Sequence, residues 1–174
     1  MKKGSRGFSL IELLIVVAII LIIAAIAIPN LLRSRIAANQ ASAVGSLRTL
    51  NTAEVTYATT YNTGYSATLG DLGPGTGGAT GAPNATAAGL IDEVLSGVTG
   101  GGGPTAMTSS KSGYQFTYSP AGTDSSGRIN TYSFTATPIN VGTTGTNYYY
   151  TDQSGVIRQN STAVAGSSDS PLAG

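Results

Sequence analysis

The sequence predicts an α+β protein in which a long, kinked N-terminal helix, over about residues 8–61, packs against a C-terminal antiparallel sheet of about four strands. Three observations support this prediction. Residues 8–28 form an almost unbroken apolar run, residues 30–61 continue with helical periodicity, and segments after residue 113 alternate aromatic with polar side chains.

The apolar run, residues 8–28, follows a short basic head formed by Lys2, Lys3 and Arg6, and Glu12 is its one charged residue. A helix of this length reaches roughly 30 Å, enough to cross the hydrocarbon core of a bilayer. The positive head is expected to stay in the cytoplasm, so the rest of the chain faces outward. A secretory signal peptide and a generic single-span anchor are alternatives, although the apolar region of a signal peptide is usually shorter.

Residues 29–61 are expected to continue the helix in an amphipathic form. Pro29 lacks a backbone N–H and clashes with the preceding turn, which predicts a kink there. The apolar residues of this half recur on one helical face, which we expect to be buried against the sheet. They are Ile36, Val44, Leu47, Leu50, Tyr57 and Tyr61.

Residues 62–113 differ in composition, because 14 of the 24 glycines fall there. The stretch is predicted to be a variable loop region with one short helix over residues 85–95, for which Asn84 would be the N-cap. Its few large apolar residues give little burial, so we expect it to be the most mobile part of the outer domain.

Residues 114–174 are predicted to form the sheet and a C-terminal tail. Four strands are expected, at residues 114–118, 132–136, 148–151 and 156–158. Short connections favour an antiparallel meander whose aromatic face covers the long helix. The tail from Asn160 has little to bury and is expected to be loosely ordered.

The composition excludes several kinds of chemistry. The chain has no histidine and no cysteine, so metal sites built on these residues, thiol nucleophiles and disulfides are ruled out. Nine basic and eight acidic residues form no basic patch, so nucleic-acid binding is not predicted. We expect no enzyme activity, no cofactor and no metal site, and we interpret Asp124, Asp152 and Asp169 as turn residues.

Two other functions are alternatives. One is an exported enzyme that the helix tethers to the membrane, and the other is an electron-conducting fibre, because the chain has nine tyrosines.

The order Gly7-Phe8-Ser9-Leu10-Ile11-Glu12 before a long apolar run resembles the leader and N-terminal helix of type IV pilins and the related pseudopilins. The resemblance implies cleavage after Gly7 by a prepilin peptidase, N-methylation of Phe8 by the same enzyme, and a role for Glu12 in assembly. Pro29 matches the proline that the family carries where the helix leaves the membrane. Residues 1–7 would then be a leader peptide.

The resemblance implies a structural subunit of a type IV pilus-like filament. Its precursor would be a single-pass protein of the bacterial inner membrane, with a cytoplasmic N-terminus, that meets lipid, the prepilin peptidase and the assembly machinery. After cleavage it would polymerise with copies of itself through residues 8–28, and the Phe8 amine of one copy would neutralise Glu12 of another. The alternative is a pseudopilin of a type II secretion system, which shares this N-terminus and assembles in the periplasm.

Overall fold

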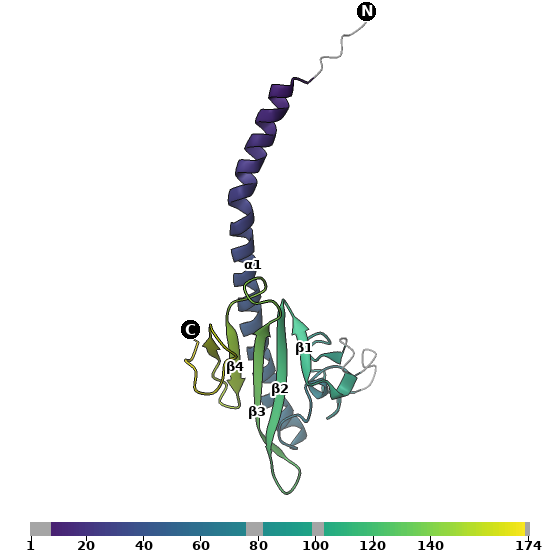
Figure 1. The fold of residues 1–174 in the computed structure, drawn as a ribbon. Coiled ribbons are helices and arrows are strands. Elements are labelled where there is room, and N and C mark those ends of the chain that lie inside the picture. The colour runs from purple at the N-terminus through teal and green to yellow at the C-terminus, as the bar shows by residue number, and fades with distance from the viewer. Residues whose placement is uncertain (1–7, 76–81, 99–102, 173–174) are drawn as a thin grey trace, which may run out of the picture. The chain divides into compact units, whose positions relative to one another are not determined.

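The computed structural model describes residues 8–75, 82–98 and 103–172 and divides the chain into two compact units (Figure 1). These are residues 1–35, called the N-terminal unit below, and residues 36–174, called the C-terminal unit. Helix α1, Leu10–Tyr61, begins in the first and ends in the second. The predicted leader, including Gly7, lies outside the described residues.

Helix α1 confirms the predicted long N-terminal helix, and it continues without interruption through Pro29. Its length and composition suffice to cross a membrane, with a mean hydropathy of 3.3 over its most apolar window. None of that window is buried inside the protein. The kink at Pro29 stays a prediction.

The sheet has five strands rather than the four that the sequence predicted. They are β1 Thr108–Lys111, β2 Tyr114–Thr123, β3 Ile129–Pro138, β4 Tyr148–Asp152 and β5 Arg158–Asn160. Each strand pairs antiparallel with its neighbour in sequence, which confirms the predicted meander. The additional strand, β1, lies inside the predicted loop region and joins β2 through Ser112 and Gly113, both of which have positive φ.

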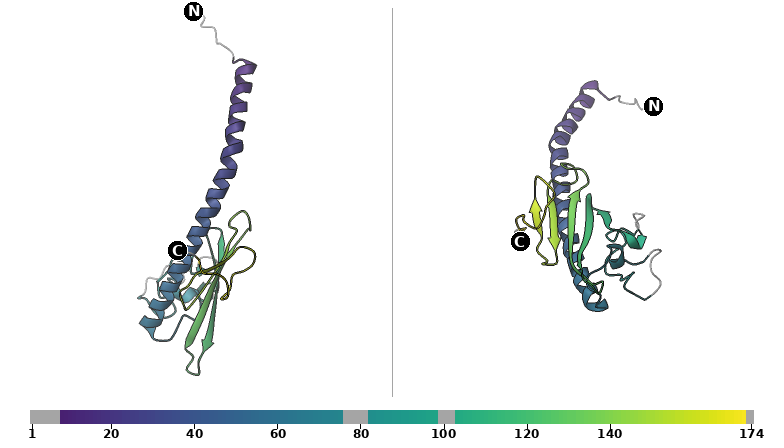
Figure 2. Two further views of the ribbon diagram at one scale, coloured as in Figure 1. Left: turned by 90° about the vertical axis from the view of Figure 1, so that its left-hand side faces the viewer. Right: turned by 60° about the horizontal axis from the view of Figure 1, so that its bottom comes forward.

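The core of the C-terminal unit lies between α1 and one face of the sheet (Figure 2). From the predicted helical face, Leu47, Leu50 and Tyr57 are buried, whereas Ile36, Val44 and Tyr61 are only partly buried. The sheet contributes its alternate aromatic residues, as predicted. They are Tyr114, Phe116, Tyr118, Tyr132, Phe134 and Tyr149.

The loop region between α1 and β1 contributes to the same core, so the expected lack of burial was wrong. Leu69, Leu72 and Leu95 are at most 1% exposed. The short helix predicted over residues 85–95 is absent, and the chain there forms turns with Gly89 at φ 64°. The described helical pieces of this region are the 3₁₀ turns η1 Gly70–Leu72 and η3 Gly103–Thr105.

The prediction of a loosely ordered tail was also wrong for the described residues up to 172. The Leu172 N–H donates to the Ile157 carbonyl at 2.8 Å, and the Gln159 N–H donates to the Ser170 carbonyl at 3.0 Å. Asp169 accepts hydrogen bonds from the Asn160 side chain and the Gly166 N–H. The tail therefore folds back along β5 and covers that edge of the sheet.

Candidate functional site

The candidate assembly site lies at the start of α1, where Phe8 precedes the helix by two residues and Glu12 lies in its first turn. Phe8 is 79% exposed. The Ser9 N–H donates to Glu12 Oε2 at 2.9 Å, so the carboxylate satisfies one of the backbone donors that the first turn of a helix leaves unpaired. A negative charge at this end is also favoured by the helix dipole. Glu12 thus already has a structural role within its own chain.

The surface that follows Glu12 is apolar on every side of the helix. Large side chains from Leu10 to Leu32 are exposed, for example Leu10 at 79% and Ile26 at 71%. An apolar surface of this size is far larger than a soluble monomer normally exposes. It therefore requires either lipid or other protein around it.

Further along α1, the helical face opposite the sheet is exposed but carries little charge. Thr49, Thr52 and Thr56 donate their hydroxyl hydrogens to the carbonyls four residues earlier, at 2.8–3.1 Å. Their hydroxyls are therefore satisfied within the helix. Together with Arg48 and Leu90 they line a groove of about 300 Å³.

A buried carboxylate, Glu54, is the functional candidate that the sequence reasoning missed. It lies on the buried face of α1 with no exposed surface, and it accepts hydrogen bonds from both the hydroxyl and the backbone N–H of Ser66, at 2.7 and 3.0 Å. Burial raises its pKa to about 6, although the Ser66 hydrogen bonds oppose that shift. No local pattern marked this residue, because a glutamate within an amphipathic helix normally faces water.

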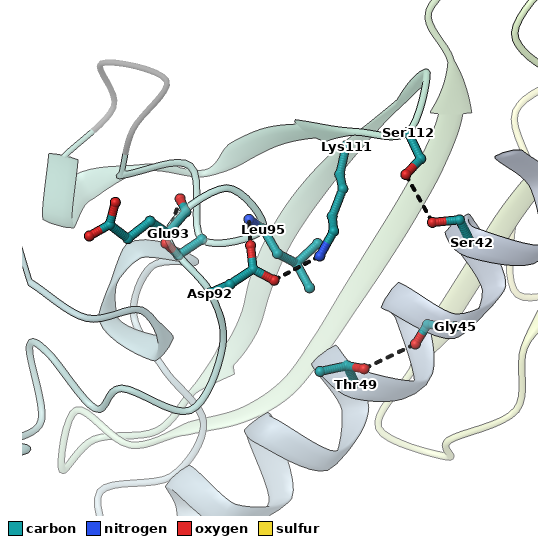
Figure 3. A network of polar contacts seen from close by, with 9 residues as sticks. Ser42, Gly45, Thr49, Asp92, Glu93, Leu95, Lys111 and Ser112 are labelled. Carbon is teal, nitrogen blue, oxygen red and sulfur yellow. Dashed lines mark hydrogen bonds and ion pairs between the residues drawn. The ribbon is translucent and has the colours of Figure 1, made fainter. Parts of the chain in front are cut away.

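A second set of contacts ties the loop region to β1 (Figure 3). The Lys111 ammonium lies 2.7 Å from Asp92 Oδ2, and Asp92 Oδ1 accepts from the Leu95 N–H at 2.9 Å. Both charged side chains are about a third to a half exposed, so this ion pair contributes less than about 1 kcal/mol. Next to it, Ser42 of α1 donates to the Ser112 hydroxyl at 2.9 Å.

The three aspartates interpreted as turn residues each bond within their own turn. Asp124 accepts from the hydroxyl and N–H of Ser126, and Asp152 accepts from the same groups of Ser154. The Ser126 hydroxyl is the main reason that the pKa of Asp124 falls to about 2. Within the described part of the chain, no group of three or more acidic residues is placed to hold a metal ion.

Comparison with known proteins gives short matches. Residues 2–28 match the family model of the prokaryotic N-terminal methylation motif. The chain is 51% identical over 53 residues to the type IV major pilin protein PilA of Myxococcus xanthus, covering 30% of this chain and 24% of that protein. It is 62% identical over 37 residues to the type IV wide pilus major component PilA4 of Thermus thermophilus, covering 21% of this chain and 28% of that protein. No solved structure matches.

These matches and the fold point to one class of protein. A methylation-motif helix followed by an antiparallel sheet that packs on the same helix is a pilin-like arrangement, and part of the chain is similar to type IV pilins. The chain spans about a quarter of the length of the curated relatives that it matches.

Proposed function

We propose that this protein is the structural subunit of a type IV pilus-like filament, which assembles by packing the N-terminal helices of many copies together. The observation that supports this function best is the apolar surface of α1, which is exposed on every side from Leu10 to Leu32. A bilayer would cover that surface in the precursor, and neighbouring helices would cover it in the filament. The C-terminal unit has a core of its own and needs no contribution from this surface.

The exposed face of α1 in the C-terminal unit supports the same role. Threonines that bond their own backbone present methyl groups outward, and Gly45 leaves open space beside them. These threonines add little desolvation penalty when another helix covers the face, because their hydroxyls are already satisfied.

The proposal includes cleavage of the leader peptide and pairing of Glu12 with the Phe8 amine of another copy. The leader of residues 1–7 would be removed after Gly7, and Phe8 would become the methylated N-terminus. Glu12 lies in the first turn of α1, which Phe8 precedes by two residues, and a carboxylate in a water-free helical core needs a cationic partner. The Phe8 amine of a neighbouring copy is that partner, and the pairing sets the axial offset between subunits.

The test is mass spectrometry of filaments sheared from cells, combined with a Glu12→Ala strain that lacks the wild-type subunit. We expect a mature chain that lacks residues 1–7 and carries one extra methyl group. The Glu12→Ala protein should be inserted and cleaved but yield little filament. A mature terminus near Ala27 would show processing by an ordinary signal peptidase, and a normal filament yield from Glu12→Ala would refute the assigned pairing.

The same preparation separates a pilus from a pseudopilus. A pilus subunit is recovered in the sheared surface fraction, whereas a type II secretion pseudopilin stays with the cell envelope after identical processing. Recovery of the processed chain only from the envelope would favour the pseudopilin.

A further inference from the structure

Glu54 connects three elements of the C-terminal unit through one residue, Ser66. The carboxylate on α1 binds both donors of Ser66, which follows the end of the helix by five residues. The hydroxyl of Tyr118, on β2, donates to the Ser66 carbonyl at 2.7 Å. All three side chains are at most 2% exposed. We call these residues, with the neighbouring Asp71, the Glu54 cluster.

The Glu54 cluster contains acids but no base among the described residues that bond to it. Asp71 is 7% exposed, and its negative charge acts unfavourably on an ionised Glu54. The other titratable groups facing Glu54 are the hydroxyls of Tyr57, Tyr118 and Tyr132, which stay neutral until far above neutral pH. Ionised Glu54 is therefore a buried charge held only by hydrogen bonds, which is an unfavourable arrangement.

Protonation removes that charge and adds a donor. Both carboxylate oxygens accept from Ser66, so protonation of one of them weakens one of these hydrogen bonds, while the other oxygen still accepts. The protonated cluster gives up that contact but no longer holds an unpaired buried charge beside Asp71.

We propose that the Glu54 cluster is a proton-controlled attachment of the loop region, in which protonation of Glu54 fastens residues 64–72 to α1 and β2 and ionisation loosens them. The inference does not depend on the proposed filament role. It assigns a pH response to the C-terminal unit of an outward-facing protein.

The direction of the response follows from the raised pKa of Glu54. A carboxylic acid that binds its proton more tightly in the folded state than in the unfolded state loses stability as pH rises through the interval between the two pKa values, here 4.5 to about 6. The corresponding change in the unfolding equilibrium constant is about 30-fold. The pKa values of Asp92 and Asp124 are lowered, so their effects fall below this interval. Burial also raises the pKa of Asp71, which adds a loss of stability in the same direction as pH rises.

The experiment is urea unfolding of the full chain in detergent micelles at several pH values from 4 to 7.5, together with amide hydrogen exchange of residues 64–72. We expect the unfolding constant of the wild type to rise by about 30-fold over this range. Exchange at residues 64–72, corrected for intrinsic rate, should accelerate more than exchange in β2 and β3. Glu54→Gln should remove most of both responses, whereas Asp124→Asn, a control outside the Glu54 cluster whose carboxyl has a lowered pKa, should keep them.

Two further measurements decide the case if Glu54→Gln does not fold. Ser66→Ala removes a hydrogen bond that favours the ionised carboxylate, so it should move the midpoint of the transition to higher pH. The carboxyl carbon of Glu54, followed by nuclear magnetic resonance in the wild type, should titrate near pH 6. Titration at or below pH 4.5, or an unchanged pH response in Glu54→Gln, would overturn the proposal.

Discussion

Substitution of Gly145 by alanine is expected to destabilise the C-terminal unit, because the space for a side chain is already occupied. A Cβ at this position would overlap the Tyr114 hydroxyl and lie 2.6 Å from its Cζ. Tyr114 has no exposed surface, and its hydroxyl donates to the Asn147 carbonyl at 2.8 Å. The ring therefore has no free direction in which to move.

The loss of unfolding free energy is set by whichever of two structural adjustments costs less free energy. Expelling the ring would forfeit roughly 2 kcal/mol or more of burial and about 1 kcal/mol from its hydrogen bond. Displacing the loop that carries Gly145 would strain the contact in which Asn39 donates to the Thr144 carbonyl at 2.9 Å. Overpacking of this kind typically costs 1–3 kcal/mol, and we expect about 2 kcal/mol for Gly145→Ala.

The assay is urea unfolding of the full chain in detergent, followed by near-ultraviolet circular dichroism of the buried tyrosines. Gly166→Ala is the matched control, because no atom lies within 4 Å of its added Cβ. We expect that control to stay within about 0.5 kcal/mol of the wild type. The reasoning is refuted if Gly145→Ala and Gly166→Ala have the same free energy of unfolding.

Two further substitutions test helix α1. Gly45→Ala should stabilise the C-terminal unit by up to about 1 kcal/mol in the same assay, because nothing lies within 4 Å of the added Cβ and alanine is the better helix former. A lower free energy of unfolding in Gly45→Ala would contradict this prediction. Arg128→Met should lower the free energy of unfolding by about 1 kcal/mol, because Arg128 Nη1 donates to the Asn62 carbonyl at 2.7 Å just beyond the helix end. An unchanged value for Arg128→Met would show that this contact contributes nothing.

The sequence predicted the elements that have a strong period. The apolar run gave the start of α1, and alternating aromatics gave the centres of β2 and β3. Strand β1 was not predicted, because the segment Thr108-Ser-Ser-Lys111 has no apolar alternation. The pair Ser112-Gly113 was the only turn signal next to this strand. Strands β2 and β3 also extend beyond the predicted ends, since pairing continues to Thr123 and Ile129, where Asp124 closes the turn.

The site was predictable only where a local motif defined it. Phe8 and Glu12 lie at the start of α1, where the motif placed them, although the bond from Ser9 to Glu12 was not foreseen. Glu54 was not predictable, because its partner Ser66 is 12 positions away in sequence, and Tyr118, which donates to Ser66, is 52 positions beyond that. The order of the C-terminal tail was also not predictable, because it depends on hydrogen bonds to β5 that form only in the folded unit.

The order of the strands has a consequence for folding. Because every strand of the sheet pairs with the next one in the chain, each hairpin can close as soon as its second strand is available. The sheet does not wait for a distant partner, and no disulfide has to form or be corrected. Apart from β1, which is the edge strand on the other side of the sheet, the newest strand is the one with a free edge at each moment, until residues 169–172 bond to β5. In the export and assembly that the proposed function implies, this order limits pairing of a newly emerged copy with the wrong chain.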